Sequence, residues 1–208
     1  MRYRQYYTHI IWDFNGTVLN DVTLCLNILN GMLSRRNVPT FELEEYKEIF
    51  GFPIRDYYTR AGFDFTNESY ETLAEEYIEE YVPKSLLCPL YDGIRELLSD
   101  IRSRGISQIL LSASDMSVLD TQLETLGIRE LFDTVLGLDN IYAHSKTEVA
   151  KQWLNEAKPY RAVLIGDTTH DYKVARELGI DCILLSCGHH SYERLQSCGV
   201  PVYRDIKS

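Results

Sequence analysis

The sequence has no apolar run close to the length of a membrane-spanning helix. Such a helix needs ~20 consecutive apolar residues, and residues 1–7 also lack the apolar stretch and small-residue cleavage site of a signal peptide. Positive charge is in the minority as well, with a formal net charge of −10. This balance argues against nucleic acid or an anionic membrane as the main partner. A small anionic substrate stays possible, because a local pocket can be positive on an acidic protein.

Paired cysteines at redox or zinc-binding spacing are also absent. The five cysteines form an odd set without a Cys-x-x-Cys pair, and no Cys or His pair has a matching second pair. We therefore expect free, mostly buried thiols in a reducing cytoplasm. No repeat or coiled-coil heptad is evident, and we expect a monomer or a weak homodimer.

Strand patterns and helix patterns alternate along most of the chain. Short runs of aliphatic or β-branched residues occur at 9–12, 106–111, 134–136, 162–165, 182–185 and 200–203. Near-continuous apolar runs of this length are typical of strands that are buried on both faces of a parallel sheet.

Amphipathic helix patterns lie between these runs. They cover residues 94–101, 118–126, 145–157 and 172–178. Asp115 is a candidate N-cap, and Ser145 with Glu148 forms a candidate capping box. The alternation predicts a Rossmann-like α/β fold with a doubly wound parallel sheet.

One region interrupts the alternation. From about residue 22 to residue 87 the pattern is helical only, with no convincing strand. We predict an α/β core domain made of residues 1–17 and 88–208, with a helical cap domain at 18–87. Ligands bind outside the carboxyl ends of the strands in open α/β sheets, so a cap inserted after the first strand would cover that site.

Two acidic residues follow apolar strands at distant points of the chain. Asp13 ends the first run and is followed by a Gly-Thr turn, while Asp167 comes directly after the run at 162–165. If these strands are neighbours, Asp13, Asp167 and Asp171 converge, and a hard cation such as Mg²⁺ would neutralise them. Alternatively, Asp13 forms the turn and Asp171 caps the next helix.

Further residues suit a phosphate group. Ser112 and Ala113 follow another predicted strand and offer a hydroxyl and backbone N–H groups. Lys146 lies in the first turn of a predicted helix, where its charge opposes the helix dipole unless an anion is close. A solvated surface lysine is the alternative interpretation.

Taken in order, these motifs resemble the haloacid dehalogenase superfamily. The similarity is to its phosphatases with an inserted helical cap, the phosphoglycolate phosphatase and β-phosphoglucomutase-like subfamily. It implies that Asp13 is the nucleophile, that Ser112, Ala113, Thr17 and Lys146 hold the phosphoryl oxygens, and that Lys146 also serves catalysis. It further implies that Mg²⁺ is bound by Asp13, the Asn15 backbone carbonyl, Asp167 and Asp171. The expected function is hydrolysis of a small phosphorylated metabolite through an aspartyl phosphate.

Asn15 departs from the family pattern, which has a second Asp at this position as the catalytic acid and base. An amide cannot shuttle a proton. Candidates for a replacement are His170, His144 and the pair Tyr57-Tyr58. Alternatively, the substrate has a good leaving group such as an acyl or aryl phosphate, or the protein is a weak or inactive catalyst that binds a phosphometabolite.

The cap is expected to select the substrate. The segment at 47–55 resembles the specificity loop of helical-cap members, with Lys47 or Arg55 reaching a second anionic group. An ordinary connection between helices is the alternative. His189-His190 could line the rim of the pocket, although a polar helix start is the favoured interpretation. The 15 tyrosines are interpreted as packing residues.

Overall fold

The computed structural model describes residues 7–138 and 145–207, and its centre is a parallel sheet. The strands are β1 (His9–Asp13), β2 (Ser107–Asp115), β3 (Thr134–Leu138), β4 (Ala162–Gly166), β5 (Asp181–Leu185) and β6 (Val202–Tyr203). They lie in the order β3-β2-β1-β4-β5-β6, and every neighbouring pair is parallel. The predicted Rossmann-like, doubly wound α/β sheet is confirmed.

Helices cover both faces of this sheet. Along β1, Ile10 and Trp12 pack on one face and Ile11 on the other, as the two-residue period of a strand requires. Helices α5 (Ile94–Ser103) and α6 (Met116–Thr125) supply residues to the first face. The second face is covered by α7 (Lys146–Ala157), α8 (Thr169–Leu178) and α9 (Tyr192–Gln196). A short 3₁₀ helix (Arg129–Leu131) precedes β3.

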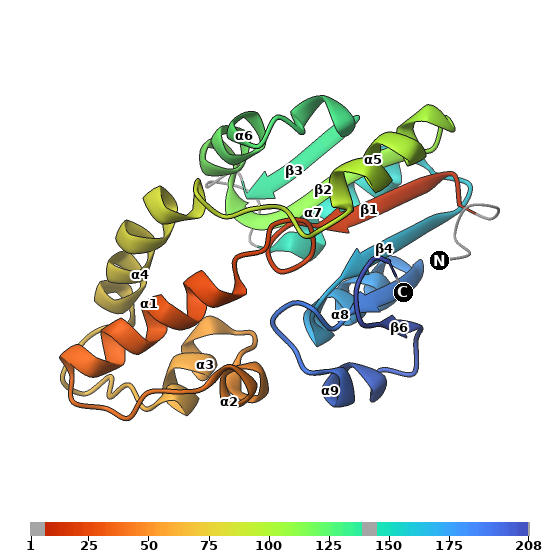
Figure 1. Ribbon diagram of the computed structural model, residues 1–208. Helices are drawn as coiled ribbons and strands as arrows, with labels where there is room; N and C mark the ends of the chain where they lie inside the picture. Colours follow the sequence, from red (N-terminus) through yellow and green to blue (C-terminus); the bar gives the residue numbers. More distant parts are fainter. Residues whose placement is uncertain (1–6, 139–144, 208) are drawn as a thin grey trace.

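Four helices lie between β1 and α5 in the sequence, and we call them the helical insert. They are α1 (Val22–Arg35), α2 (Leu43–Ile49), α3 (Ile54–Ala61) and α4 (Tyr70–Ser85). They share a hydrophobic cluster of their own, with Leu29, Met32 and Leu33 of α1 fully buried. The arrowheads of β1, β3 and β4 point toward the insert in Figure 1. The boundaries of a separate cap domain at 18–87 stay a prediction.

Several helix starts follow the local chemistry of the sequence. The Asp115 side chain accepts a hydrogen bond from the Ser117 backbone N–H at the start of α6. Ser145 accepts from the Glu148 N–H in the same way at the start of α7. Helix α8 begins at Thr169, three residues before the predicted Tyr172, because Thr168 is the residue that caps it.

The topology brings β1 and β4 side by side at the centre of the sheet. Trp12 lies opposite Ile165 in the register, so Asp13 and the residues that follow β4 emerge at the same edge. The strand order reverses direction at this pair, which is where open α/β sheets bind ligands. Within the described residues, no helix is both long and apolar enough to span a bilayer.

Candidate active site

Three buried carboxylates meet where β1 and β4 end. Asp13, Asp167 and Asp171 each place one carboxylate oxygen within 4.8 Å of the others. Asp13 comes from the end of β1, Asp167 directly follows β4, and Asp171 lies in the first turn of α8. The residues that were expected to converge are therefore brought together, although Asp13 is more than 150 positions away from the other two in the chain.

Lys146 is the cation of this cluster. Its Nζ donates to Asp13 Oδ1, and to Asp171 Oδ1 at 2.7 Å, and only 5% of its side chain is exposed. Burial alone would lower the pKa of Lys146, but the two carboxylates outweigh burial and raise it. The alternative of a solvated surface lysine is wrong, since Lys146 lies in the first turn of α7 and points into the site.

Asp171 has two roles at once. Its Oδ2 accepts from the Thr168 backbone N–H at 3.0 Å and from the Thr168 hydroxyl at 2.6 Å, which completes a capping box for α8. Its Oδ1 faces Lys146. Burial acts to raise the pKa of Asp171, but Lys146 and Thr168 outweigh burial and hold it below the usual value. The capping interpretation and the site interpretation are therefore compatible.

Of the three carboxylates, Asp167 is the one whose negative charge is least balanced by positive charge nearby. It accepts hydrogen bonds from the His189 backbone N–H at 2.6 Å and from the Thr17 hydroxyl at 3.3 Å. Burial raises the pKa of Asp167 to about 6, and the nearby His189 only partly opposes this effect. Burial likewise raises the pKa of Asp13 well above its ordinary value, despite Lys146. The cluster therefore carries more negative charge than Lys146 can balance.

This donor set fits a hard divalent cation. Carboxylate oxygens are the ligands that Mg²⁺ prefers, and the excess negative charge supplies the electrostatic reason to bind it. Two glycines pack directly against Asp167: a Cβ on Gly188 would lie 2.1 Å from its Oδ2, and one on Gly16 would lie 2.3 Å from the same atom. Gly16 also has φ +74°, which favours glycine. No side chain larger than hydrogen is tolerated behind this carboxylate.

Ser112 follows Leu111, which lies opposite Asp13 in the register of β1 and β2, and its neighbours Ala113 and Ser114 continue along β2. The Ser112 side chain is buried, its hydroxyl accepts from the Ser114 N–H at 3.0 Å, and it lies 3.4 Å from Asn15 Oδ1. Strand β2 continues through Ser112 to Asp115 with an irregular register, whereas the sequence pattern ended it at residue 111. The Thr17 hydroxyl is directed at Asp167.

Asn15 belongs to a second, buried network that the sequence did not reveal. Its Nδ2 donates to Asp21 Oδ2 at 3.0 Å and to the Tyr81 hydroxyl at 2.6 Å. Tyr81 in turn donates to Asp21 Oδ2 at 2.7 Å, and the Gly16 N–H donates to Asp21 Oδ1 at 2.9 Å. A carboxylate therefore lies next to the amide that stands in place of the expected acid.

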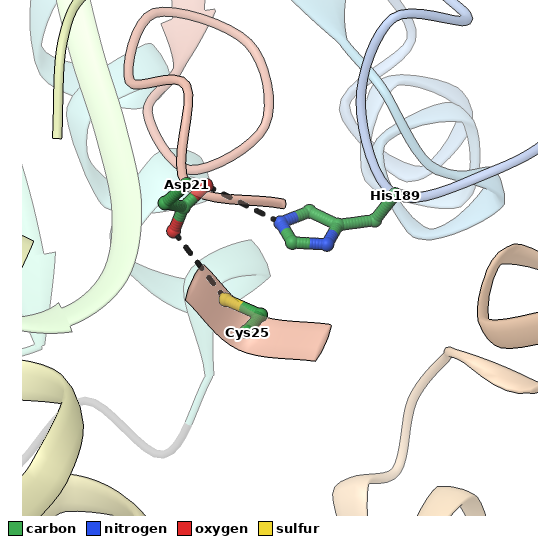
Figure 2. Close-up of side chains that lie close together, drawn as sticks. All are labelled: Asp21, Cys25 and His189. Carbon is green, nitrogen blue, oxygen red and sulfur yellow. Dashed lines mark hydrogen bonds and ion pairs between the residues drawn. The ribbon is translucent and has the colours of Figure 1, made fainter. Parts of the chain in front are cut away.

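His189 completes this network from the other end of the chain. Figure 2 shows its ring turned toward Asp21, with Cys25 on the opposite side of the same carboxylate. His189 Nε2 lies 3.5 Å from Asp21 Oδ1, and its Nδ1 is 2.8 Å from the Tyr46 hydroxyl. Burial opposes the charged forms, but these contacts lower the pKa of Asp21 and raise that of His189.

The other candidate residues lie at different places. Helix α9 begins at Tyr192 with Ser191 as its cap, so His189-His190 does not start a helix. His190 Nδ1 accepts from the Thr169 N–H at 3.0 Å, and both histidines are buried. His170 packs against Phe52 with ring centroids 4.7 Å apart. His144 lies outside the described residues.

The two cations expected to select the substrate have other contacts. Lys47 Nζ donates to the Ser186 carbonyl at 3.4 Å. Arg55 is exposed, with its guanidinium 5.0 Å from the centre of the Phe65 ring. Neither is among the residues that line the cavity between the insert and the sheet. Spacing alone could not show this, because the direction of each side chain depends on how α2 and α3 pack.

Comparison with known proteins identifies the family to which the chain belongs. A family model described as haloacid dehalogenase-like hydrolase matches residues 10–185. The chain belongs to the haloacid dehalogenase-like hydrolase family. The matched residues include all four motifs, from Asp13 through Ser112 and Lys146 to Asp167 and Asp171. The expected family membership is confirmed.

Individual relatives are distant. The chain is 25% identical over 184 residues to tyrosine-protein kinase PtkA of Mycobacterium tuberculosis, which covers 86% of this chain but only 62% of that protein. It is 23% identical over 191 residues to phosphoglycolate phosphatase of Synechococcus elongatus, covering 89% of this chain and 87% of the relative. A haloacid dehalogenase-like hydrolase from Streptococcus pneumoniae superposes with a TM-score of 0.80 at 22% identity, covering 94% of this chain and 92% of that one. The last similarity shows the fold alone.

A methyl group behind Asp167 should disrupt the site. We expect Gly188→Ala to displace the Asp167 carboxylate and to lower stability by about 1–3 kcal/mol, the usual cost of overpacking. It should also abolish any rise in melting temperature on adding Mg²⁺. Gly31→Ala is the matched control, because it lies within α1 with only Arg35 Nη1 near the new Cβ, at 3.4 Å. The control should gain about 0.5–1 kcal/mol and keep the response to Mg²⁺, and an unchanged response in Gly188→Ala would contradict the assignment.

The raised pKa of Asp167 predicts a pH-dependent effect on stability in the presence of a chelator. The folded state holds this proton up to about pH 6, against an ordinary value of 3.8, so its charged form destabilises the fold at neutral pH. Asp167→Asn should therefore raise the melting temperature at a pH well above 6 and have little effect near pH 4. Asp171→Asn should behave oppositely and lose most stability at neutral pH, because the pKa of Asp171 is lowered. Equal shifts at both pH values for Asp167→Asn would refute this account.

Proposed function

We propose that the chain is a Mg²⁺-dependent phosphatase that hydrolyses a small phosphorylated metabolite, with Asp13 as the nucleophile. The observation that carries the proposal is the convergence of Asp13, Asp167 and Asp171 around the buried Lys146. The name of the Synechococcus elongatus relative, phosphoglycolate phosphatase, supports a phosphoric monoester as substrate class. Residues 18–87 would act as a cap over the site.

The residues divide the work between charge and position. Asp13 would attack the phosphorus in line and form an aspartyl phosphate, which water then hydrolyses. Lys146 would hold the Asp13 carboxylate in place and balance charge on the phosphoryl oxygens, as phosphoryl transfer requires. Ser112, Ala113 and Thr17 would contribute hydroxyl and backbone N–H contacts to those oxygens. Asn15 would lie beside the oxygen of the leaving group without giving it a proton.

The metal would be held by Asp13, Asp167, Asp171 and the backbone carbonyl of Asn15. When bound, Mg²⁺ would supply positive charge to the phosphoryl oxygens and relieve the repulsion among the carboxylates. We also infer a cytoplasmic location and a monomer or weak homodimer, without nucleic acid or a membrane as partner. The five free thiols support the location, and the net charge of −10 supports the choice of a small ligand.

Hydrolysis of p-nitrophenyl phosphate tests this proposal, because its leaving group needs little protonation. We expect turnover that requires Mg²⁺ and disappears with a chelator. Asp13→Ala should abolish turnover and also trapping by beryllium fluoride, since no carboxylate remains to bond to either group. Asp120→Asn is the control and should retain activity, because the Asp120 side chain is half-exposed on α6. Activity in Asp13→Ala would exclude the nucleophile, and an inert wild-type protein would favour the alternative of a phosphometabolite-binding protein.

The contact between Asn15 and Asp21 predicts the outcome of restoring the family's acid. Asn15→Asp alone would place a second carboxylate where Nδ2 now donates to Asp21 at 3.0 Å, so we expect a lower melting temperature. The exchange Asn15→Asp with Asp21→Asn keeps one amide and one carboxylate and should recover stability. It should also raise turnover of alkyl phosphates by about 10²–10⁴-fold, the usual contribution of a general acid. Full stability of Asn15→Asp alone would show that the two side chains are not coupled.

A further inference from the structure

A cavity of about 350 Å³ lies between the helical insert and the sheet, directly beside Asn15. Asn15 and Ala113 line it on the side of the sheet, and helices α3 and α4 form the opposite wall. Because Asn15 comes two residues after Asp13, the cavity lies where the leaving group would be when a phosphoryl group contacts Asp13. Its volume is near the lower end of the range for small-molecule sites, about 300–1,000 Å³, which suits a single substituted ring.

The wall of this cavity is mainly aromatic. Seven of the residues that line it are Phe or Tyr. The rings of Phe50 and Tyr57 meet edge to face at 5.1 Å, and those of Tyr77 and Tyr81 stack at 5.7 Å. Ile78 adds an aliphatic side chain that remains 53% exposed. Edge-to-face and offset contacts of this kind favour a further planar ring over a flexible polar chain.

The charge along the same wall is unfavourable for an anion. Among the described residues that line the cavity there is no lysine or arginine, whereas Asp21 and Asp115 both contribute to it. His189 also lines the cavity, but its ring faces Asp21 (Figure 2). The carboxylate of Asp21 therefore balances the positive charge of the protonated ring. A carboxylate or second phosphate on the substrate would lose its water here without gaining a cation. The cavity therefore disfavours metabolites with a second acidic group.

Asn15 adds an independent chemical constraint. Its amide hydrogens are directed to Asp21 and Tyr81, and its Oδ1 lies 3.4 Å from the Ser112 hydroxyl and 3.3 Å from that of Ser114. Asn15 thus has no proton to give to the oxygen that leaves. A phenolic hydroxyl has a pKa of roughly 10, well below that of water or an ordinary alcohol, so an aryl oxide leaves with far less help than an alkoxide.

We propose that the cavity binds the ring of a small aryl phosphate, so that the substrate is a phenolic phosphate ester without a second acidic group. The proposal rests on the proposed phosphatase function and defines its substrate class. Asp13 Oδ forms a bond to phosphorus as the bond from phosphorus to the phenolic oxygen breaks. The aryl oxide leaves with that electron pair and takes a proton from water. A second water then hydrolyses the aspartyl phosphate, releasing inorganic phosphate.

Binding of phosphonates tests the cavity without any turnover. Methylphosphonate, benzylphosphonate and phosphonoacetate share the phosphonate group and differ in what enters the cavity. With Mg²⁺ present, calorimetry should show benzylphosphonate binding at least about tenfold more tightly than methylphosphonate, in line with the value of filling an apolar pocket. Phosphonoacetate should bind no more tightly than methylphosphonate. Tighter binding of phosphonoacetate than of benzylphosphonate would overturn the proposal.

A charged variant tests the same wall during turnover. Acetyl phosphate has a good leaving group but no ring, so the ratio of kcat/KM for phenyl phosphate to that for acetyl phosphate isolates the cavity. Ile78→Arg places a cation in the wall and should lower this ratio about tenfold, while tightening phosphonoacetate. Leu87→Arg makes the same kind of change at a site that is 85% exposed and does not line the cavity, and it should leave the ratio unchanged.

The outcomes separate the two proposals. If neither phenyl phosphate nor acetyl phosphate is hydrolysed but benzylphosphonate still binds preferentially, the phosphatase function fails and the aromatic cavity stands. If both phosphates are hydrolysed but Ile78→Arg and Leu87→Arg give the same ratio, the phosphatase function stands and the assignment of the cavity fails.

Discussion

The contact of Lys146 with Asp13 and Asp171 is the interaction on which the rest of this structure depends. Buried carboxylates at the end of a sheet repel one another, and burial also opposes their charge. One lysine from the first turn of α7 meets both of them, so β1, α7 and α8 are held at the same edge. Asp167 stays outside this pair and accepts hydrogen bonds from the His189 backbone N–H and the Thr17 hydroxyl.

The same constraint extends into the helical insert. Gly16, three residues after Asp13, donates its backbone N–H to Asp21. Asp21 in turn contacts Tyr81 of α4 and His189 of the loop after β5. His189 in turn contacts Tyr46 of α2 and gives its backbone N–H to Asp167. The insert is therefore joined to the carboxylate cluster by a continuous set of hydrogen bonds. A change in the position of the insert would therefore alter the hydrogen bonding around Asp167.

The amide at position 15 is better understood together with Asp21 than alone. An aspartate at both positions would place two carboxylates in contact, one of them buried, whereas an amide and a carboxylate satisfy each other. In the proposed mechanism, that arrangement leaves no proton donor at position 15 beside the leaving group. An aromatic cavity without lysine or arginine in its described lining lies on the same side. Both features support the proposed substrate class, in which the leaving group departs readily and has no second acidic group.

Much of this arrangement was determined by the sequence itself. Apolar runs and local caps predicted the parallel strands and the helix starts, because strand burial and N-terminal capping depend on neighbours a few residues away. The order of Asp13, Ser112, Lys146 and Asp167 indicated the family and the edge of the sheet where they meet. Only the tertiary structure placed Asp21 against Asn15, turned His189 inward, and directed Lys47 and Arg55 away from the cavity. These contacts join elements far apart in the chain, and the packing of the insert on the sheet, which decides them, leaves no local pattern in the sequence.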